Sequence, residues 1–156
     1  MTKNITKMKN LFDKRYTGEI IRRLDNLTQS SQRLWGKMEV AQMLAHCRKT
    51  LEMATGDKIL PRVFIGKLIG RFFVKEFSNE KPFGKNGPTD KTLKIANRRD
   101  FEIEKRKLIE YIEKFQIGGE GKCTTHPHPF FGKVTPREWS IGMYKHLDHH
   151  LRQFGV

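Results

Sequence analysis

The chain has 156 residues, of which 37% are hydrophobic, and its 31 Lys or Arg against 17 Asp or Glu give a formal net charge of +14. This length supplies one hydrophobic core, so we expect a single domain over residues 1–156. The apolar residues recur at helical spacing, which excludes a disordered chain, and no run of about twenty apolar residues suggests a membrane-spanning helix.

The N-terminal residues 1–9 lack the apolar segment of a secretory signal. We therefore expect a cytoplasmic protein. The two cysteines, Cys47 and Cys123, agree with a reducing compartment, and no Cys-x-x-Cys pair suggests a thiolate metal site.

Hydrophobic periodicity predicts four long helices and one helical insertion. In chain order, the expected elements cover residues 17–27, 37–54, 63–77, 90–115 and 135–154, and no strand pattern competes with them. Gly56 is expected to close the second helix and Gly118 the fourth of these elements. We therefore predict an all-α, up-down four-helix bundle with an extra helical segment between the second and third main helices.

The extra segment carries the spacing Gly66-Lys67-Leu68-Ile69-Gly70, but Lys67 and the following Arg71 exclude a helix that spans a bilayer. Packing across one end of the bundle, or forming a wall of a cleft, is the favoured interpretation. Two alternatives remain. The basic, amphipathic segment can lie on an anionic membrane, or Phe72 and Phe73 can form the surface of a homodimer.

The last helix is predicted to begin at Thr135, because Thr135-Pro136-Arg137-Glu138 is a capping box with proline at the first helical position. Gly142 leaves room for the close approach of a neighbour. One stripe of this helix contains Trp139, Met143, His146, His150 and Phe154, whereas Lys145, Asp148 and Arg152 are expected to face away.

His146 and His150 are four residues apart, which places both imidazoles on one face of the helix. This is the spacing of a two-histidine metal clamp. Because a catalytic zinc-type site typically takes three protein ligands and keeps one open position, we expect a third donor from elsewhere in the fold. The best candidate is His46, at the edge of the apolar stripe of helix 37–54, although a lone histidine there can also be a structural residue bonded to the backbone.

Three further residues are candidates for supporting roles around such a site. On the last helix, His149 precedes His150 and lies at the margin of the apolar stripe, and Gln153 follows His150 by nearly one turn. His128 and His126 lie in a proline-stiffened loop before that helix. His128 can lean over the site or hydrogen bond to a ligand, but a solvated loop histidine is the favoured interpretation.

These motifs resemble the DinB/YfiT-like superfamily, and the ending of the chain is similar to an uncharacterised branch of it. The resemblance rests on Leu44-Ala45-His46 behind Trp35-Gly36-Lys37, and on His146-Leu147-Asp148-His149-His150-Leu151-Arg152-Gln153-Phe154-Gly155. It implies a four-helix bundle in which one histidine of the second helix and two of the fourth bind a divalent metal. The matching positions are His46, His146 and His150.

Imidazole donors suit zinc or nickel, with iron as an alternative. The resemblance implies a metal-dependent thiol S-transferase, which activates a low-molecular-weight thiol, or a hydrolase acting on a small-molecule substrate. No general base is evident. The alternative function is a non-catalytic, basic binding protein with a structural or incidental metal, whose partner is nucleic acid or protein. Because Lys and Arg are spread along the chain without a recognition motif, a generally basic surface is favoured over a dedicated nucleic-acid reader.

Overall fold

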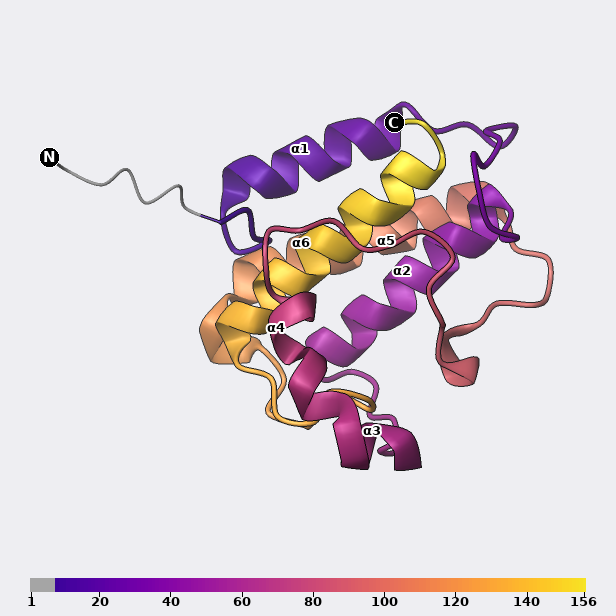
Figure 1. Ribbon diagram of the computed structural model, residues 1–156. Coiled ribbons are helices and arrows are strands. Elements are labelled where there is room, and N and C mark those ends of the chain that lie inside the picture. Colours follow the sequence, from indigo (N-terminus) through magenta and orange to yellow (C-terminus); the bar gives the residue numbers. More distant parts are fainter. Residues whose placement is uncertain (1–7) are drawn as a thin grey trace, which may run out of the picture.

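A computed structural model describes residues 8–156, so most of the segment used to exclude a secretory signal, residues 1–7, lies outside the described residues. Within the described range the regular structure is helical, apart from one isolated β-bridge between His128 and Gly132 (Figure 1). The predicted all-α class and the extra helical segment are confirmed. The long helices are α1 (Lys14–Asp25), α2 (Val40–Ala54), α5 (Phe101–Gly118) and α6 (Pro136–Gln153), and the shorter elements are α3 (Phe64–Ile69), η1 (Gly70–Phe73), α4 (Val74–Phe77), η2 (Lys91–Leu93) and η3 (Glu120–Lys122).

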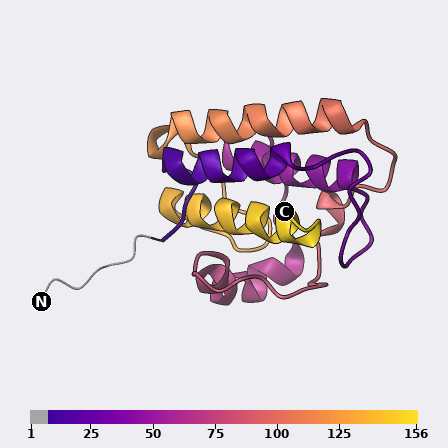
Figure 2. The same cartoon turned by 90° about the horizontal axis from the view of Figure 1, so that it is seen from above.

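The four long helices pack around a common core. Helix α1 contacts α5 and α6, and α2 contacts the same two helices. Each helix contributes fully buried side chains, for example Ile20, Leu44, Leu108 and Leu147. The segment α3–η1–α4 covers the α6 side of this group and lies away from α5 (Figure 2).

The helix directions differ from the simple alternation predicted for an up-down bundle. Arg48 near the middle of α2 pairs with Glu104 early in α5, and Asp57 just after α2 pairs with Lys114 late in α5. Helices α2 and α5 are therefore parallel. The connection over residues 55–100 is long enough to return the chain to the end where α2 began. For this reason α5 can run parallel to α2, whereas a short loop would have made the two helices antiparallel.

Helices α1 and α6 are also parallel to each other. The Leu11 backbone N–H donates to the Ser140 carbonyl at 3.1 Å near the starts of both helices, and Arg23 pairs with Asp148 at 2.7 Å towards their ends. Since α5 packs against α1 in the opposite direction, with Phe115 stacked on Phe12, the order of directions is up, down, down, up.

Capping side chains decide where the helices start. Helix α1 begins at Lys14, ahead of the predicted residue 17, because the Asp13 carboxylate accepts from the Arg15 N–H at 3.0 Å. Helix α2 begins at Val40, not at 37, and the Glu39 N–H donates to Gln42 Oε1 at 2.9 Å. The predicted capping box of α6 is confirmed, with Thr135 Oγ1 accepting from the Glu138 N–H at 3.2 Å.

The predicted helix over 90–115 is wrong in its first part. Asp100 caps α5 by accepting from the Ile103 N–H at 2.9 Å, and the helix then runs from Phe101 to Gly118. Asp90 bonds locally to the Thr92 N–H at 2.7 Å, which supports the short turn η2 and competes with a longer helix. As a consequence, the Leu93 carbonyl is free of helical bonding and points at α2.

The predicted close approach at Gly142 is confirmed, since the ring of Phe77 from α4 lies where a Cβ would stand. The packing of α4 on α6 also shows that the expectation of an outward-facing Lys145 is wrong. This residue is buried, because its ammonium donates to the Glu76 carbonyl and, at 2.8 Å, to Asn79 Oδ1. A buried ammonium needs such partners, and the connection after α4 supplies them.

No helix in residues 8–156 combines the length and the apolar composition that a membrane crossing requires.

Candidate metal centre

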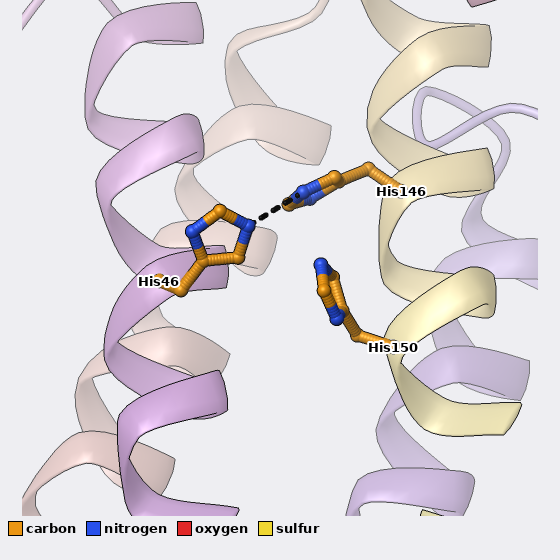
Figure 3. Close-up of side chains that lie close together, drawn as sticks. All are labelled: His46, His146 and His150. Carbon is orange, nitrogen blue, oxygen red and sulfur yellow. Dashed lines mark hydrogen bonds between the residues drawn. The ribbon is translucent and has the colours of Figure 1, made fainter. Parts of the chain in front are cut away.

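Three histidines from two antiparallel helices lie together inside the bundle. His46 projects from α2, and His146 and His150 project from successive turns of α6 (Figure 3). One ring nitrogen of each lies within 4.8 Å of the others, and His46 Nε2 is 3.0 Å from His146 Nε2. A cluster of this size could hold a metal ion.

His46 is held by the backbone of the connection before α5. The imidazole is buried, with 4% of the residue exposed, and its Nδ1 lies 2.9 Å from the Leu93 carbonyl oxygen. Because a carbonyl oxygen can only accept, the hydrogen-bond network assigns the proton to Nδ1. The lone pair of the ring is then on Nε2, which faces His146.

His150 is held in the same way by a glutamine. Its Nδ1 lies 2.8 Å from Gln153 Oε1, and Gln153 Nε2 donates to the Trp35 carbonyl at 2.8 Å. The second bond fixes the orientation of the amide, so the oxygen faces the imidazole and accepts from Nδ1–H. His150 therefore also presents Nε2 as its unprotonated nitrogen.

The third histidine, His146, also has an acceptor beside its Nδ1, at a longer distance. Its Nδ1 lies 3.4 Å from Thr50 Oγ1, and the Thr50 hydroxyl already donates to the Cys47 carbonyl at 2.7 Å. When the hydroxyl oxygen accepts from the imidazole, Nε2 again has the lone pair; in the other tautomer of His146, Nε2–H donates to His46 Nε2 at 3.0 Å. All three rings thus have an oxygen acceptor beside Nδ1.

With all three protons on Nδ1, three lone pairs face the same space. Two unprotonated Nε2 atoms 3.0 Å apart repel each other unless a cation, either a proton or a metal ion, lies between them. Ligand nitrogens around a tetrahedral ion with bonds of 2.0–2.1 Å are about 3.3 Å apart. The observed spacings, 3.0 Å for one pair and at most 4.8 Å for all three, bracket that value.

Burial keeps these imidazoles neutral. It lowers the pKa of His46, lowers the pKa of His150 to about 3, and, together with the neighbouring rings of His150 and His46, lowers the pKa of His146 well below its ordinary value. Neutral imidazole is the form that coordinates metals. The trio is therefore in its metal-binding form at neutral pH.

The supporting candidates separate into two groups. Gln153 is hydrogen bonded to His150, as described above, whereas His149 makes ring contacts: its ring lies 5.0 Å from the His150 ring, 5.7 Å from the Trp35 ring and 6.0 Å from the Phe83 ring. His149 thus contacts the cluster on one side and a neighbouring space on the other. That space is a cavity of about 110 Å³ whose walls also include Pro82, Lys85, Lys145, Asp148 and Arg152.

The favoured interpretation of His128 as a solvated loop histidine is wrong. Its ring packs against Phe77 and Trp139, and its Nδ1 accepts the backbone N–H of Phe130 at 3.0 Å and of Phe131 at 3.2 Å. The two bonds turn the loop back on itself, so His128 is a structural residue. His126, in contrast, is exposed, as expected for a solvated loop histidine.

The role of His128 predicts an acid-sensitive fold. Burial lowers its pKa to about 4, below the ordinary value of 6.5, so the unfolded chain binds the proton first. The stability from His128 is complete above pH 6.5 and is lost as the pH falls towards 4, to a total of about 3 kcal/mol. We expect His128→Asn, which keeps an acceptor but cannot titrate, to reduce the pH dependence of the free energy of unfolding between these pH values, while the other buried histidines retain theirs. Urea titrations with a chelator present measure this, and an unchanged pH slope would contradict it.

The cysteines supply no reactive thiolate. Cys47 and Cys123 are both buried and free, and burial raises the pKa of Cys123 to about 11 and that of Cys47 further. Both thiols stay protonated near neutral pH. A covalent mechanism through a cysteine nucleophile therefore has no support.

Residues 7–155 match the family described as "Protein of unknown function (DUF1569)". The chain belongs to the DUF1569 family. No curated protein and no solved structure matches the chain. The match extends over both histidine-bearing helices, so the clustered imidazoles lie within the region that DUF1569 describes.

The contacts of Thr50 and of the Leu93 carbonyl with the cluster were not predicted from the sequence. Thr50 follows His46 by one helical turn on the same face of α2, and this spacing is a signal that could have identified it. The Leu93 carbonyl has no such signal. It reaches His46 only because the helix predicted over residues 90–100 does not form.

Proposed function

We propose that His46, His146 and His150 bind a divalent metal, zinc or nickel with iron as an alternative, and that this protein is a metal-dependent enzyme of the thiol S-transferase or hydrolase type. The observation that carries the proposal is the oxygen acceptor beside Nδ1 of each of the three rings. In metal sites a ligating histidine usually donates its other N–H to a neighbouring acceptor, which fixes the ring and increases its basicity. Three such acceptors around one cluster are hard to explain by packing alone.

The donor set suits an activating role. Three neutral imidazoles leave a divalent ion its full charge and a vacant position, where it lowers the pKa of a bound water or thiol. The protein's own groups orient the site: Leu93, Thr50 and Gln153 hold the three Nδ1 atoms. The cavity beside α6, with Lys85 and Arg152 in its wall, would attract an anionic substrate or thiol.

The DinB/YfiT-like resemblance agrees with this proposal. The family pattern takes one metal ligand from the second main helix and two from the last, and the three clustered histidines of this chain come from α2 and α6. Membership of DUF1569 is compatible with that superfamily. We therefore propose that the bundle is of the DinB/YfiT-like type.

A non-catalytic binding protein is the second candidate, favoured by the net charge of +14. A surface that binds nucleic-acid phosphates must lose affinity steeply as salt rises. Salt-sensitive binding of nucleic acid that persists in His146→Ala would support this candidate and would separate it from any function of the histidines.

Metal analysis of protein purified without a histidine tag tests the main proposal. We expect about one equivalent of metal per chain, bound by the three-histidine site. Gln153→Leu removes the acceptor of His150 and should weaken the affinity about 10–100-fold while the stoichiometry is kept. Protein that binds no zinc, nickel or iron above a nonspecific level at neutral pH would contradict the proposal.

A further inference from the structure

The segment α3–η1 turns its large hydrophobic side chains away from the protein. Phe64, Leu68 and Phe72 are 76%, 60% and 79% exposed, and they recur every four residues on one side of the segment. Each is followed by a second exposed apolar residue. We call this set the apolar ridge: Phe64, Ile65, Leu68, Ile69, Phe72 and Phe73.

The ridge is fixed in this orientation by the small residues behind it. Gly66 and Gly70 are buried, and a Cβ on either one would overlap the Phe130 backbone. The Val63 N–H donates to the Pro129 carbonyl at 3.0 Å, and the Arg62 guanidinium donates to the same oxygen at 3.2 Å. The Gly-x-x-x-Gly spacing therefore docks the segment against the loop before α6, with its bulky side outward.

Cations lie beside the ridge. Lys67, Arg71 and Lys75 are exposed and are also spaced by four, so they form a row between the ridge and the docked side. Residues 58–75 contain no Asp or Glu. The segment lies at one edge of the molecule, with α3 far from α1 (Figures 1 and 2).

We propose that the apolar ridge binds the surface of an anionic lipid membrane. Aromatic and aliphatic side chains on one side, with lysine and arginine at their margin, are the composition of helices that lie in the headgroup region of a bilayer. Pairing of two copies through the ridge would bring both rows of cations together on chains that each carry +14, and this repulsion disfavours self-association. A negatively charged lipid surface instead complements the cations while it covers the apolar side chains.

Co-sedimentation with vesicles tests the proposal. We expect the full chain to bind vesicles in which about a third of the lipid is phosphatidylserine, to release as salt rises, and to bind phosphatidylcholine vesicles weakly. Phe64→Ser with Phe72→Ser should lower the binding at least about tenfold, and so should Lys67→Glu with Arg71→Glu. The matched controls are Ile117→Ser, at a residue 80% exposed on α5, and Arg98→Glu with Lys107→Glu, both at exposed positions away from the ridge.

A label that reports its surroundings adds a positional readout. Phe72→Cys carrying a polarity-sensitive fluorophore should shift to shorter wavelength on addition of the anionic vesicles, whereas Ile117→Cys should not, and the native cysteines are buried. Undiminished binding in the ridge variants, no binding at low salt, or an equal shift at both labels would overturn the proposal. A dimer seen by sedimentation that disappears in Phe64→Ser with Phe72→Ser would identify a second copy as the occupant and would also overturn it.

Discussion

Replacing His150 by Ala is expected to abolish the stabilisation of this protein by a divalent metal. An ion that binds only the folded state raises the free energy of unfolding by mass action, by about 2.7 kcal/mol at a free concentration of a hundred times Kd. For a chain of this length that corresponds to a rise in Tm of about 5–10 °C. A chelator should reverse the rise in the native protein and should have no effect on His150→Ala. Thermal unfolding followed by circular dichroism, with and without chelator, measures both.

The neighbouring residue provides the matched control. The His149 ring contacts the His150 ring at 5.0 Å between centroids but is not one of the three clustered donors, so His149→Ala should keep most of the chelator response. The response should also fade in acid, as protons compete for the imidazoles. Since burial lowers the pKa values of His46 and His150, this loss is expected below the ordinary histidine value of 6.5. An equal chelator response in His150→Ala and in the native protein would exclude His150 as a ligand.

The parts of this structure that sequence predicts are those set by local spacing. The i, i+4 separation of His146 and His150 fixes their common face on any helix, and the Thr135–Glu138 capping box fixes where that helix starts. Gly142 was identified as a point of close approach because a missing side chain on a buried stripe needs a neighbour to fill it.

What sequence does not predict depends on the long connection between α2 and α5. Periodicity assigns no direction to a helix, so the parallel pairing of α2 with α5 could not be read from it. The same connection buries Lys145 and carries the Leu93 carbonyl to His46. A backbone acceptor that arrives from a distant loop has no residue type that marks it in the sequence.

The second large effect concerns catalysis. If the proposed centre activates a thiol, then metal-loaded protein should accelerate the reaction of a low-molecular-weight thiol with an aryl chloride, in which the thiol releases its proton to the solvent, a carbon–sulfur bond forms and the carbon–chlorine bond breaks to release chloride. We expect a rate at least about a hundredfold above that of the free metal ion with the same thiol, because a bound ion supplies several kcal/mol of charge stabilisation. His146→Ala should return the rate to that background. Stopped-flow absorbance across several thiols and metals measures it.

Two further variants separate a loss of chemistry from a loss of fold. His126→Ala changes an exposed loop histidine outside the cluster and should retain the full rate. Thr50→Val keeps the shape of the side chain but removes the acceptor of His146, so we expect the rate to fall about 10–100-fold with the helical content unchanged. A native rate no greater than that of the free ion, with every thiol and metal, would exclude the transferase and leave the hydrolase as the catalytic alternative. An equal fall in His126→Ala and His146→Ala would instead show that the rate does not depend on the clustered imidazoles.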